Sequence, residues 1–179
     1  TFHPVTLENS TASDQIFQLL KALDSIHNCK IIFTKSNSDT DGRIINTLID
    51  DYVKKNPKKS VCFTSLGQLR YLSCLKYVDV VVGNSSSGLL EVPSFKIPTV
   101  NIGDRQKGRL KAKSVIDCHP SQTQISNAIK RAISLDFKNF CTSVENPYGK
   151  GGASEIIIQK LKETDFGNLL KKHFFDISN

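Results

Sequence analysis

The chain has 179 residues, of which 39% are hydrophobic and 23% charged, enough for one domain with a buried core. Its 24 lysines and arginines outnumber the 17 aspartates and glutamates, so the formal net charge is +7. No apolar run approaches the roughly 20 residues of a membrane span, and we expect neither such a span nor a signal peptide. Methionine is absent, so we expect a piece of a longer chain.

The positive charge permits binding to nucleic acid or to a membrane surface, but the lysines are spread out and no aromatic residues interleave with the basic cluster. We therefore expect a small anionic ligand, and neither nucleic acid nor membrane as partner. The cysteines, at positions 29, 62, 74, 118 and 141, form no C-x-x-C pair and are odd in number. This favours reduced thiols in a cytoplasmic protein. Cys118 and His119 have no second ligand pair at suitable spacing, so no metal site is predicted.

Strand and helix patterns alternate along the chain. Residues 1–5 resemble the end of a strand, and further strands are predicted at 30–34, 61–64, 78–82, 99–102 and 114–118. Helices are predicted at 14–23, 42–55, 67–75, after the serines at 85–87, from a capping box at 121–124 to about 135, and at 154–162. Residues 165–175 are amphipathic. The alternation predicts one α/β domain with a parallel sheet over residues 1–179.

The stretch from residue 78 to 109 carries the most specific chemistry. A β-branched run ends at Gly83 and Asn84, and a serine that follows suits the N-cap of a helix. Such a junction directs unpaired N–H groups and the positive helix end at one point, where a phosphate can bind. Small residues let an anion approach the backbone there. The predicted phosphate ligands are Ser85, Ser86, Ser87 and Gly88.

Charged residues downstream complete a possible nucleotide site. Glu91 is expected about one to one and a half turns into the helix, where its carboxylate suits a neutral diol such as ribose. Five cations then fall within nine residues: Arg105, Lys107, Arg109, Lys111 and Lys113. Glycine-serine turns are commonly only turns, and basic runs are commonly solvated faces. Their combination on a strand–turn–helix unit favours nucleotide binding.

Three motifs together resemble the hydrolysing UDP-N-acetylglucosamine 2-epimerases. They are Gly-Asn-Ser-Ser-Ser-Gly at 83–88, Glu91, and Asn-Ile-Gly-Asp-Arg-Gln-Lys-Gly-Arg at 101–109. The similarity extends from Thr-Phe-His-Pro at 1–4 to Asn-Pro-Tyr-Gly at 146–149. It covers the second of the family's two Rossmann-like domains, so it implies a glycosyltransferase-B-type architecture whose N-terminal catalytic domain is absent from this chain.

The resemblance also implies roles for individual residues. The family eliminates UDP from the sugar, adds water at C1 and reprotonates C2 on the other face, in sialic-acid-type pathways. Residues 85–88 with Arg105 would bind the pyrophosphate, Glu91 would hold the ribose, and Arg109 would be a further UDP-binding residue. His3 would reach the cleft as an acid or as a phosphate ligand. Tyr71 would pack on the uracil, although it equally suits the half-buried side of its helix.

Some implications concern what this chain lacks. The carboxylates that move protons resemble residues of the absent domain, so we expect this chain alone to be inactive, without cofactor, and the intact protein to be a homo-oligomer. The loop at 36–42 resembles an Asn-x-Asp loop at the cleft mouth. In this architecture the last helix crosses back onto the first domain, a role that Leu169, Leu170, Phe174 and Phe175 fit as well as packing within the domain.

Three alternatives stay open at this stage. A glycosyltransferase donor domain of the same fold would also bind a UDP-sugar. A non-catalytic nucleotide-sensing module would bind without turnover. A nucleic-acid-binding domain is suggested only by the net charge.

Overall fold

The computed structural model describes residues 1–5, 12–37 and 41–167. The chain divides into two compact units, residues 1–148 and residues 149–179. The described strands, together with helices α1 to α6, belong to the first unit, and helix α7 belongs to the second. Each unit is described by itself below.

The strands of the first unit form two parallel ladders. Strand β1 (Ile31–Thr34) pairs with β2 (Ser60–Phe63), and the second ladder has the order β3 (Val81–Gly83), β4 (Thr99–Ile102), β5 (Val115–Cys118). The predicted parallel sheet is therefore confirmed. Strand β3 begins at Val81, three residues later than predicted, since the backbone bends at residue 79.

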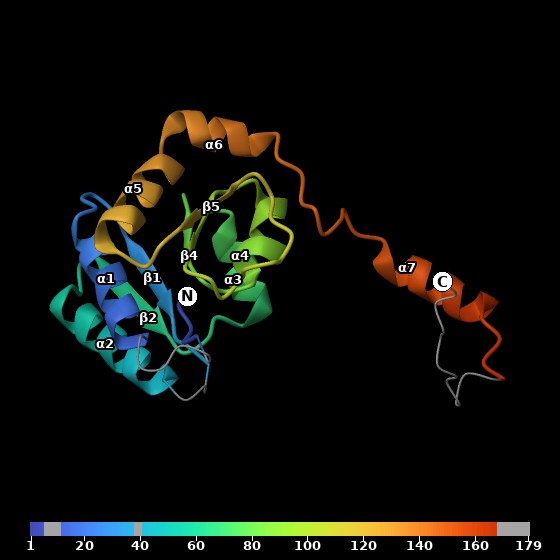
Figure 1. Ribbon diagram of the computed structural model, residues 1–179, viewed down its shortest axis with the longest axis horizontal. Coiled ribbons are helices and arrows are strands. Elements are labelled where there is room, and N and C mark those ends of the chain that lie inside the picture. The colour runs from blue at the N-terminus through green and yellow to red at the C-terminus, as the bar shows by residue number, and fades with distance from the viewer. Residues whose placement is uncertain (6–11, 38–40, 168–179) are drawn as a thin grey trace, which may run out of the picture. The chain divides into compact units, whose positions relative to one another are not determined.

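Residues 1–5 lie between the two ladders. The nitrogen of Thr1 donates to the carbonyl of Val82 at 3.3 Å, and the N–H of Asn84 donates to the carbonyl of Thr1 at 3.3 Å. On the other side the hydroxyl of Thr1 contacts that of Thr34 in β1. The spatial order is thus β2, β1, residues 1–5, β3, β4, β5, with the chain start between β1 and the second ladder (Figure 1). This is the Rossmann order, whose reversal lies between residues 1–5 and β3.

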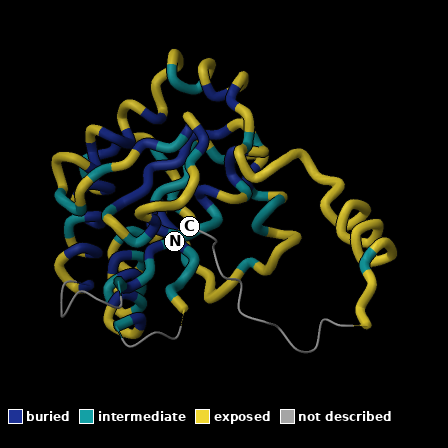
Figure 2. Tube along the Cα trace, turned by 45° about the vertical axis from the view of Figure 1, so that its right-hand side comes forward, coloured by how far each residue is buried: buried dark blue, intermediate teal, exposed yellow. Residues whose placement is uncertain are grey.

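Three helices cover one face of this arrangement. Helix α1 (Ala12–Asp24) contacts both α2 (Gly42–Lys55) and α5 (Gln122–Ala132). Their apolar residues, spaced at helical period, bury side chains such as Ile16 and Ile45 completely. Together with the inward side chains of the strands they form the main core, the dark interior of Figure 2.

Shorter helices lie after β2 and β3. Helix α3 (Gly67–Leu75) has the bounds predicted for it. Helix α4 (Ser87–Leu90) is followed, after Glu91, by a 3-10 helix, η1 (Val92–Phe95). Leu75 and Val92 form the centre of a second apolar cluster beneath them. The helix predicted after the serines is therefore only one turn long.

The predicted capping box at the start of α5 does not form. Ser121 has the extended backbone of an N-cap, yet its side chain makes no capping bond. Gln124 does not reach back to Ser121, because its Oε1 accepts the N–H of His119 at 3.3 Å. The glutamine thus secures the end of β5 rather than the helix start.

The single helix predicted to reach residue 135 is two helices. Ser134 leaves the helical conformation with φ −63° and ψ 147°, and its hydroxyl accepts the N–H of Phe137 at 3.3 Å. This side-chain cap starts α6 (Leu135–Thr142), which the sequence analysis missed.

The second unit contains the predicted helix, α7 (Ala153–Glu163). Its apolar residues are exposed, at 70% for Ile156 and 51% for Leu161. Residues 165–167 are not helical, and the rest of the predicted amphipathic segment, with Leu169, Leu170, Phe174 and Phe175, lies outside the described residues. Within the described chain, no helix combines the length and the apolar character that crossing a membrane requires.

Candidate functional site

The side chain of Asn84 organises the point where the strand order reverses. Asn84 directly follows β3 and is completely buried. Its Oδ1 accepts the N–H of His3 at 2.7 Å, and its Nδ2 donates to the carbonyl of His3 at 2.8 Å. One amide thus satisfies both main-chain groups of His3. His3 therefore lies at the carboxyl edge of the sheet, where open α/β sheets bind ligands.

The backbone carbonyl of Asn84 holds the loop that follows β4. It accepts hydrogen bonds from Nη1 of Arg105 at 3.2 Å and from Nε2 of Gln106 at 2.8 Å. Gln106 is only 1% exposed. His3, 81 positions before Asn84 in the sequence, and Arg105, 21 positions after it, thereby bond to the same residue. The predicted site residues His3 and Arg105 thus both bond to Asn84.

Gly83 allows residues 1–5 to lie this close to strand β3. Its φ is +145°, and a Cβ at this position would lie 1.8 Å from the carbonyl oxygen of Thr1. Any side chain would push residues 1–5 away from β3. The glycine therefore permits the contact that carries His3 to Asn84.

The serine turn begins immediately after Asn84. Ser86 is the N-cap residue of α4, but its side chain makes no capping bond. The first backbone bonds of the turn run from the N–H of Gly88 to the carbonyl of Ser85 and from that of Leu89 to Ser86. The N–H groups that precede them have no acceptor within the helix. With the hydroxyls of Ser85 and Ser86, they form a set of donors that directly follows Asn84.

The packing of α4 against β4 explains why position 88 is a glycine. It is buried, and a Cβ there would lie 2.7 Å from Cγ2 of Thr99 in β4. The hydroxyl of Thr99 donates to the carbonyl of Gly88 at 2.9 Å. The missing side chain thus lets α4 approach β4, and a contact of Gly88 with a ligand stays a prediction.

Tyr71, Ser87 and Glu91 gather on the other side of the turn. The hydroxyl of Tyr71, from α3, is hydrogen-bonded to Oγ of Ser87. Burial raises the pKa of Tyr71, and the negative charge of Glu91 raises it further. The phenol therefore stays protonated at neutral pH. Glu91 is half-buried and caps the C-terminal end of α4 instead of lying inside a longer helix, because α4 ends at Leu90.

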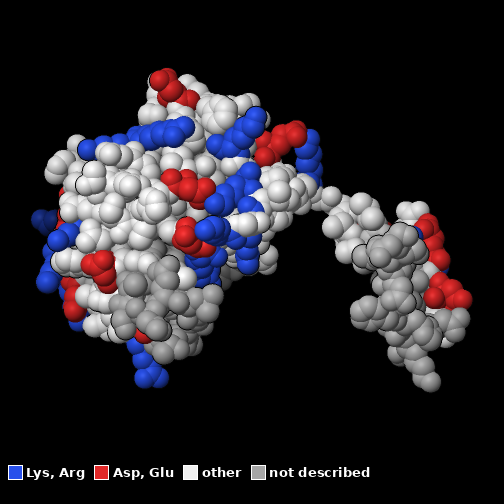
Figure 3. Space-filling model, viewed as in Figure 1, with Lys and Arg blue, Asp and Glu red and all other residues white. Residues whose placement is uncertain are grey.

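Arg109 is placed differently from Arg105. It lines a cavity of about 420 Å³ at the carboxyl ends of β4 and β5, together with residues such as Lys107 and His119. None of His3, Asn84 and Arg105 belongs to this lining. Basic side chains gather over the loop between β4 and β5 on this face (Figure 3). The structure therefore does not group Arg109 with the Asn84 cluster.

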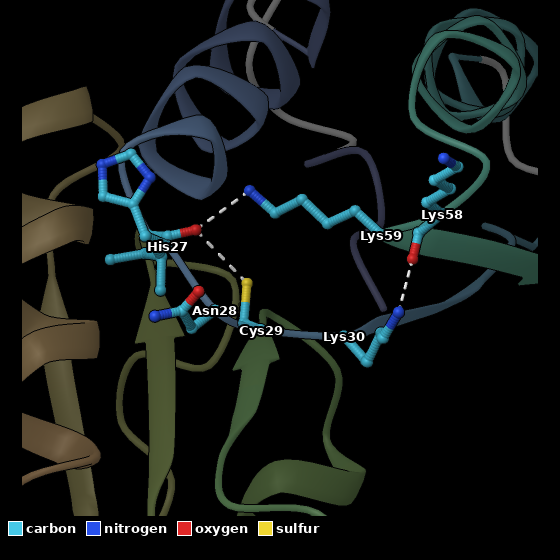
Figure 4. Close-up of a pocket in the computed structure, with 7 residues that line it drawn as sticks. His27, Asn28, Cys29, Lys30, Lys58 and Lys59 are labelled. Atoms are coloured by element: carbon cyan, nitrogen blue, oxygen red, sulfur yellow. Dashed lines mark hydrogen bonds between the residues drawn. The ribbon is translucent and has the colours of Figure 1, made fainter.

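A second cavity, of about 500 Å³, lies at the amino edge of β1 and β2 (Figure 4). The ammonium groups of two of its lysines, Lys30 and Lys59, are bound to backbone carbonyls. Nζ of Lys59 donates to the carbonyl of Leu23 at 2.7 Å and of Ile26 at 3.0 Å, and Nζ of Lys30 donates to Lys58 at 2.6 Å. Lys59 thus ties the end of helix α1 to the start of β2, and Lys30 ties the start of β1 to the residues just before β2. The positions of Lys30 and Lys59 are therefore explained by structural hydrogen bonds rather than by a ligand.

The residues that contact the His3 ring were not predicted from the sequence. Nδ1 of His3 lies 3.1 Å from Oδ1 of Asn37, 3.3 Å from its backbone nitrogen and 3.4 Å from Oγ of Ser36. The sequence signal was the polar loop after β1. Among residues 1–5, 12–37 and 41–167, no group of three or more histidines, cysteines or acids is placed to hold a metal ion.

These features define a Rossmann-like α/β domain with a donor-rich polar site at its switch point. The sequence profile of the UDP-N-acetylglucosamine 2-epimerase family matches residues 1–162. The chain belongs to this family.

Individual relatives agree with that assignment. A GDP/UDP-N,N'-diacetylbacillosamine 2-epimerase (hydrolyzing) of Campylobacter jejuni is 40% identical over 99% of this chain and 46% of its own length. A polysialic acid biosynthesis protein of Escherichia coli is 38% identical over 98% of this chain and 45% of its own length. The chain therefore spans about half the length of these curated relatives and corresponds to their C-terminal portion.

A solved structure shows the same fold. The UDP-GlcNAc 2-epimerase of Methanocaldococcus jannaschii, crystallised with UDP-GlcNAc and UDP, superposes with a TM-score of 0.71 over 91% of this chain and 44% of that one. At 18% identity this likeness concerns the fold. It confirms the predicted fold class, one half of a glycosyltransferase-B-type architecture.

Proposed function

We propose that this chain is the UDP-binding half of a hydrolysing UDP-sugar 2-epimerase. The observation that carries the proposal is the convergence on Asn84, in a chain of this family, of His3, Arg105 and the serine turn. The relative from M. jannaschii was crystallised with UDP, and a site at the switch point of a Rossmann-like sheet suits such a ligand.

The roles follow from the chemistry of each group. Arg105 pairs with the pyrophosphate, since a guanidinium can donate two parallel bonds to two oxygens. The hydroxyls and N–H groups of Ser85, Ser86 and Ser87 donate to the same oxygens. His3 lies beside them at the departing UDP. These donors stabilise the charge that develops when the bond between the sugar and UDP breaks.

The nucleoside extends from the turn toward α3. Glu91 accepts hydrogen bonds from the two ribose hydroxyls, one on each carboxylate oxygen. Tyr71, half-buried beside Ser87, provides an aromatic surface for the uracil. Because Gly88 packs against β4 and Arg109 lines another cavity, we place both at the margin of the UDP site.

The remaining chemistry belongs to a longer protein. We propose that the carboxylates that remove and return the C2 proton lie on the N-terminal half of the relatives, and that the intact enzyme is cytoplasmic and homo-oligomeric. Five free cysteines fit a reducing compartment. No cofactor is part of the proposal.

Analysis of the reaction products tests the proposal that the intact protein is a hydrolysing UDP-sugar 2-epimerase. A protein joining this chain to that N-terminal half should convert UDP-N-acetylglucosamine or a related UDP-sugar into free UDP and the 2-epimeric sugar, whereas residues 1–179 alone should release no UDP. Transfer of the sugar to an acceptor would instead identify a glycosyltransferase. Binding that prefers nucleic acid over uridine nucleotides and falls steeply with salt would contradict both.

A further inference from the structure

Asn46, on helix α2, holds the main chain of Ser36 at both ends. Its Oδ1 accepts the N–H of Ser36 at 2.8 Å, and its Nδ2 donates to the carbonyl of Ser36 at 3.4 Å. Asn84 holds His3 by the same pattern. A side-chain amide that pairs with both groups of one residue fixes the orientation of that piece of backbone.

Ser36, which Asn46 holds, and the next residue, Asn37, both contact one nitrogen of His3. Nδ1 lies within 3.4 Å of the Ser36 hydroxyl, the Asn37 side-chain oxygen and the Asn37 N–H. Asn37 therefore offers both a donor and an acceptor to the same atom. Nδ1 keeps a hydrogen bond whether or not it carries a proton. A fixed Nδ1 also fixes the plane of the ring and thus the direction of Nε2.

Helix α2 also holds Lys35, the residue before Ser36, through a second side chain on the same helix face. Asp50, four residues after Asn46, forms an ion pair with Lys35 at 2.8 Å. Asp50 also accepts from Sγ of Cys62 in β2 at 3.2 Å. Helix α2 thus holds residues 35 and 36 at two consecutive points, just before the loop that contacts His3.

We propose that Asn46 is a positioning residue for His3: through Ser36 and Asn37 it sets the orientation of the imidazole at the site. It touches no ligand itself. The proposal rests on the proposed function in giving His3 a place beside the pyrophosphate, but the positioning can be measured without any ligand.

The first experiment reads the His3 ring directly. In the ¹⁵N-labelled chain, long-range ¹H–¹⁵N spectra report the state of each ring nitrogen, and the His3 signals are those lost in His3→Gln. We expect the Nδ1 signal of His3 to differ from that of the exposed His27 and to move toward it in Asn46→Ala. Asn56→Ala is the matched control: it removes an amide that bonds only the carbonyl of Tyr52 at the far end of α2, and should leave His3 unchanged.

The ring spectra can also overturn the proposal. Asn46→Ala with a folded spectrum and unchanged His3 ring signals would show that Asn46 does not position the ring. If that variant does not fold, Asn46→Leu, which keeps the volume and removes both bonds, is judged by the same criterion.

The second experiment measures UDP affinity in single and double variants, to show whether Asn46 acts through His3. By calorimetry, Asn46→Ala should weaken UDP binding about three- to tenfold, the range expected for one net hydrogen bond. In a His3→Gln background the same substitution should add nothing, whereas additive losses would mean that Asn46 acts independently of His3. If no variant or wild type binds UDP, the proposed function fails, while the ring spectra still decide the role of Asn46.

Discussion

Replacing Asn84 by alanine tests the centre of the site. Asn84 is fully buried, and its amide makes two short bonds, 2.7 and 2.8 Å, to the backbone of His3. Alanine removes both and leaves an N–H and a carbonyl inside the fold without these partners. Since each of these two groups costs about 1–3 kcal/mol, we expect Asn84→Ala to lower the free energy of unfolding by about 2–6 kcal/mol.

The matched control is Asn146→Ala. The amide of Asn146 makes three bonds: its Nδ2 donates to the carbonyl of Leu90 and to Oγ of Ser94, both at 2.8 Å, and its Oδ1 accepts the N–H of Tyr148 at 3.0 Å. These bonds lie at the surface, so water replaces them, and we expect a loss of about 1 kcal/mol or less.

Urea denaturation followed by circular dichroism measures both variants. The reasoning is refuted if Asn84→Ala and Asn146→Ala lose the same stability. UDP affinity should fall with Asn84→Ala, because His3 is released, and stay unchanged with Asn146→Ala.

Three further predictions concern single side chains. Arg105→Lys should weaken UDP binding but leave uridine binding nearly unchanged, because an ammonium cannot reproduce the guanidinium fork; equal losses in calorimetry would make Arg105 structural. 2′-Deoxy-UDP should bind about tenfold more weakly than UDP, and the difference should disappear in Glu91→Ala; a wild type that binds both nucleotides alike would exclude the ribose role. The Lys35 ammonium lowers the pKa of Asp50 below its ordinary 3.8, so their pair stabilises the fold above that pH and the stabilisation is lost as the pH falls through the lower folded value. Lys35→Met should therefore cost about 0.5 kcal/mol at pH 7 and nothing in stronger acid, and a pH-independent cost in urea titrations would argue against the pair.

Elements with strong local patterns were predictable from sequence. The bounds of α2, α3 and β4 agree with the predicted 42–55, 67–75 and 99–102. Each combines a clear apolar period or β-branched run with a glycine or proline at its start. The resemblance to the 2-epimerases rested on short motifs and was correct about the family.

Elements decided by tertiary contacts were not predictable in the same way. The helix after the serines is one turn long because Pro93 follows closely and a 3-10 helix takes over. Gln124 suited a capping box, yet it bonds His119 instead. Pro93 is a local signal that the helix prediction left out, whereas the bond from His119 to Gln124 is not visible in a local pattern.

The same distinction holds for the site. The sequence placed Asn84 in the turn but could not show that it holds His3, which is 81 residues away. Both Arg105 and Arg109 were predicted to bind UDP, and only the folded loop shows that Arg105 bonds Asn84 while Arg109 lines the cavity at the ends of β4 and β5. The anchor at Asn46 has no sequence signal, since its partner is the backbone of Ser36.

Titration of UDP into the ¹⁵N-labelled chain tests the central claim most directly. We expect the backbone signals of Ser85, Ser86, Ser87, Glu91 and Arg105 to shift together and saturably, while those around Lys58, at the opposite edge of the sheet, stay in place. Absence of shifts at millimolar UDP, or shifts confined to the cavity lined by Arg109 or to the one lined by Lys58, would contradict a UDP site at the switch point.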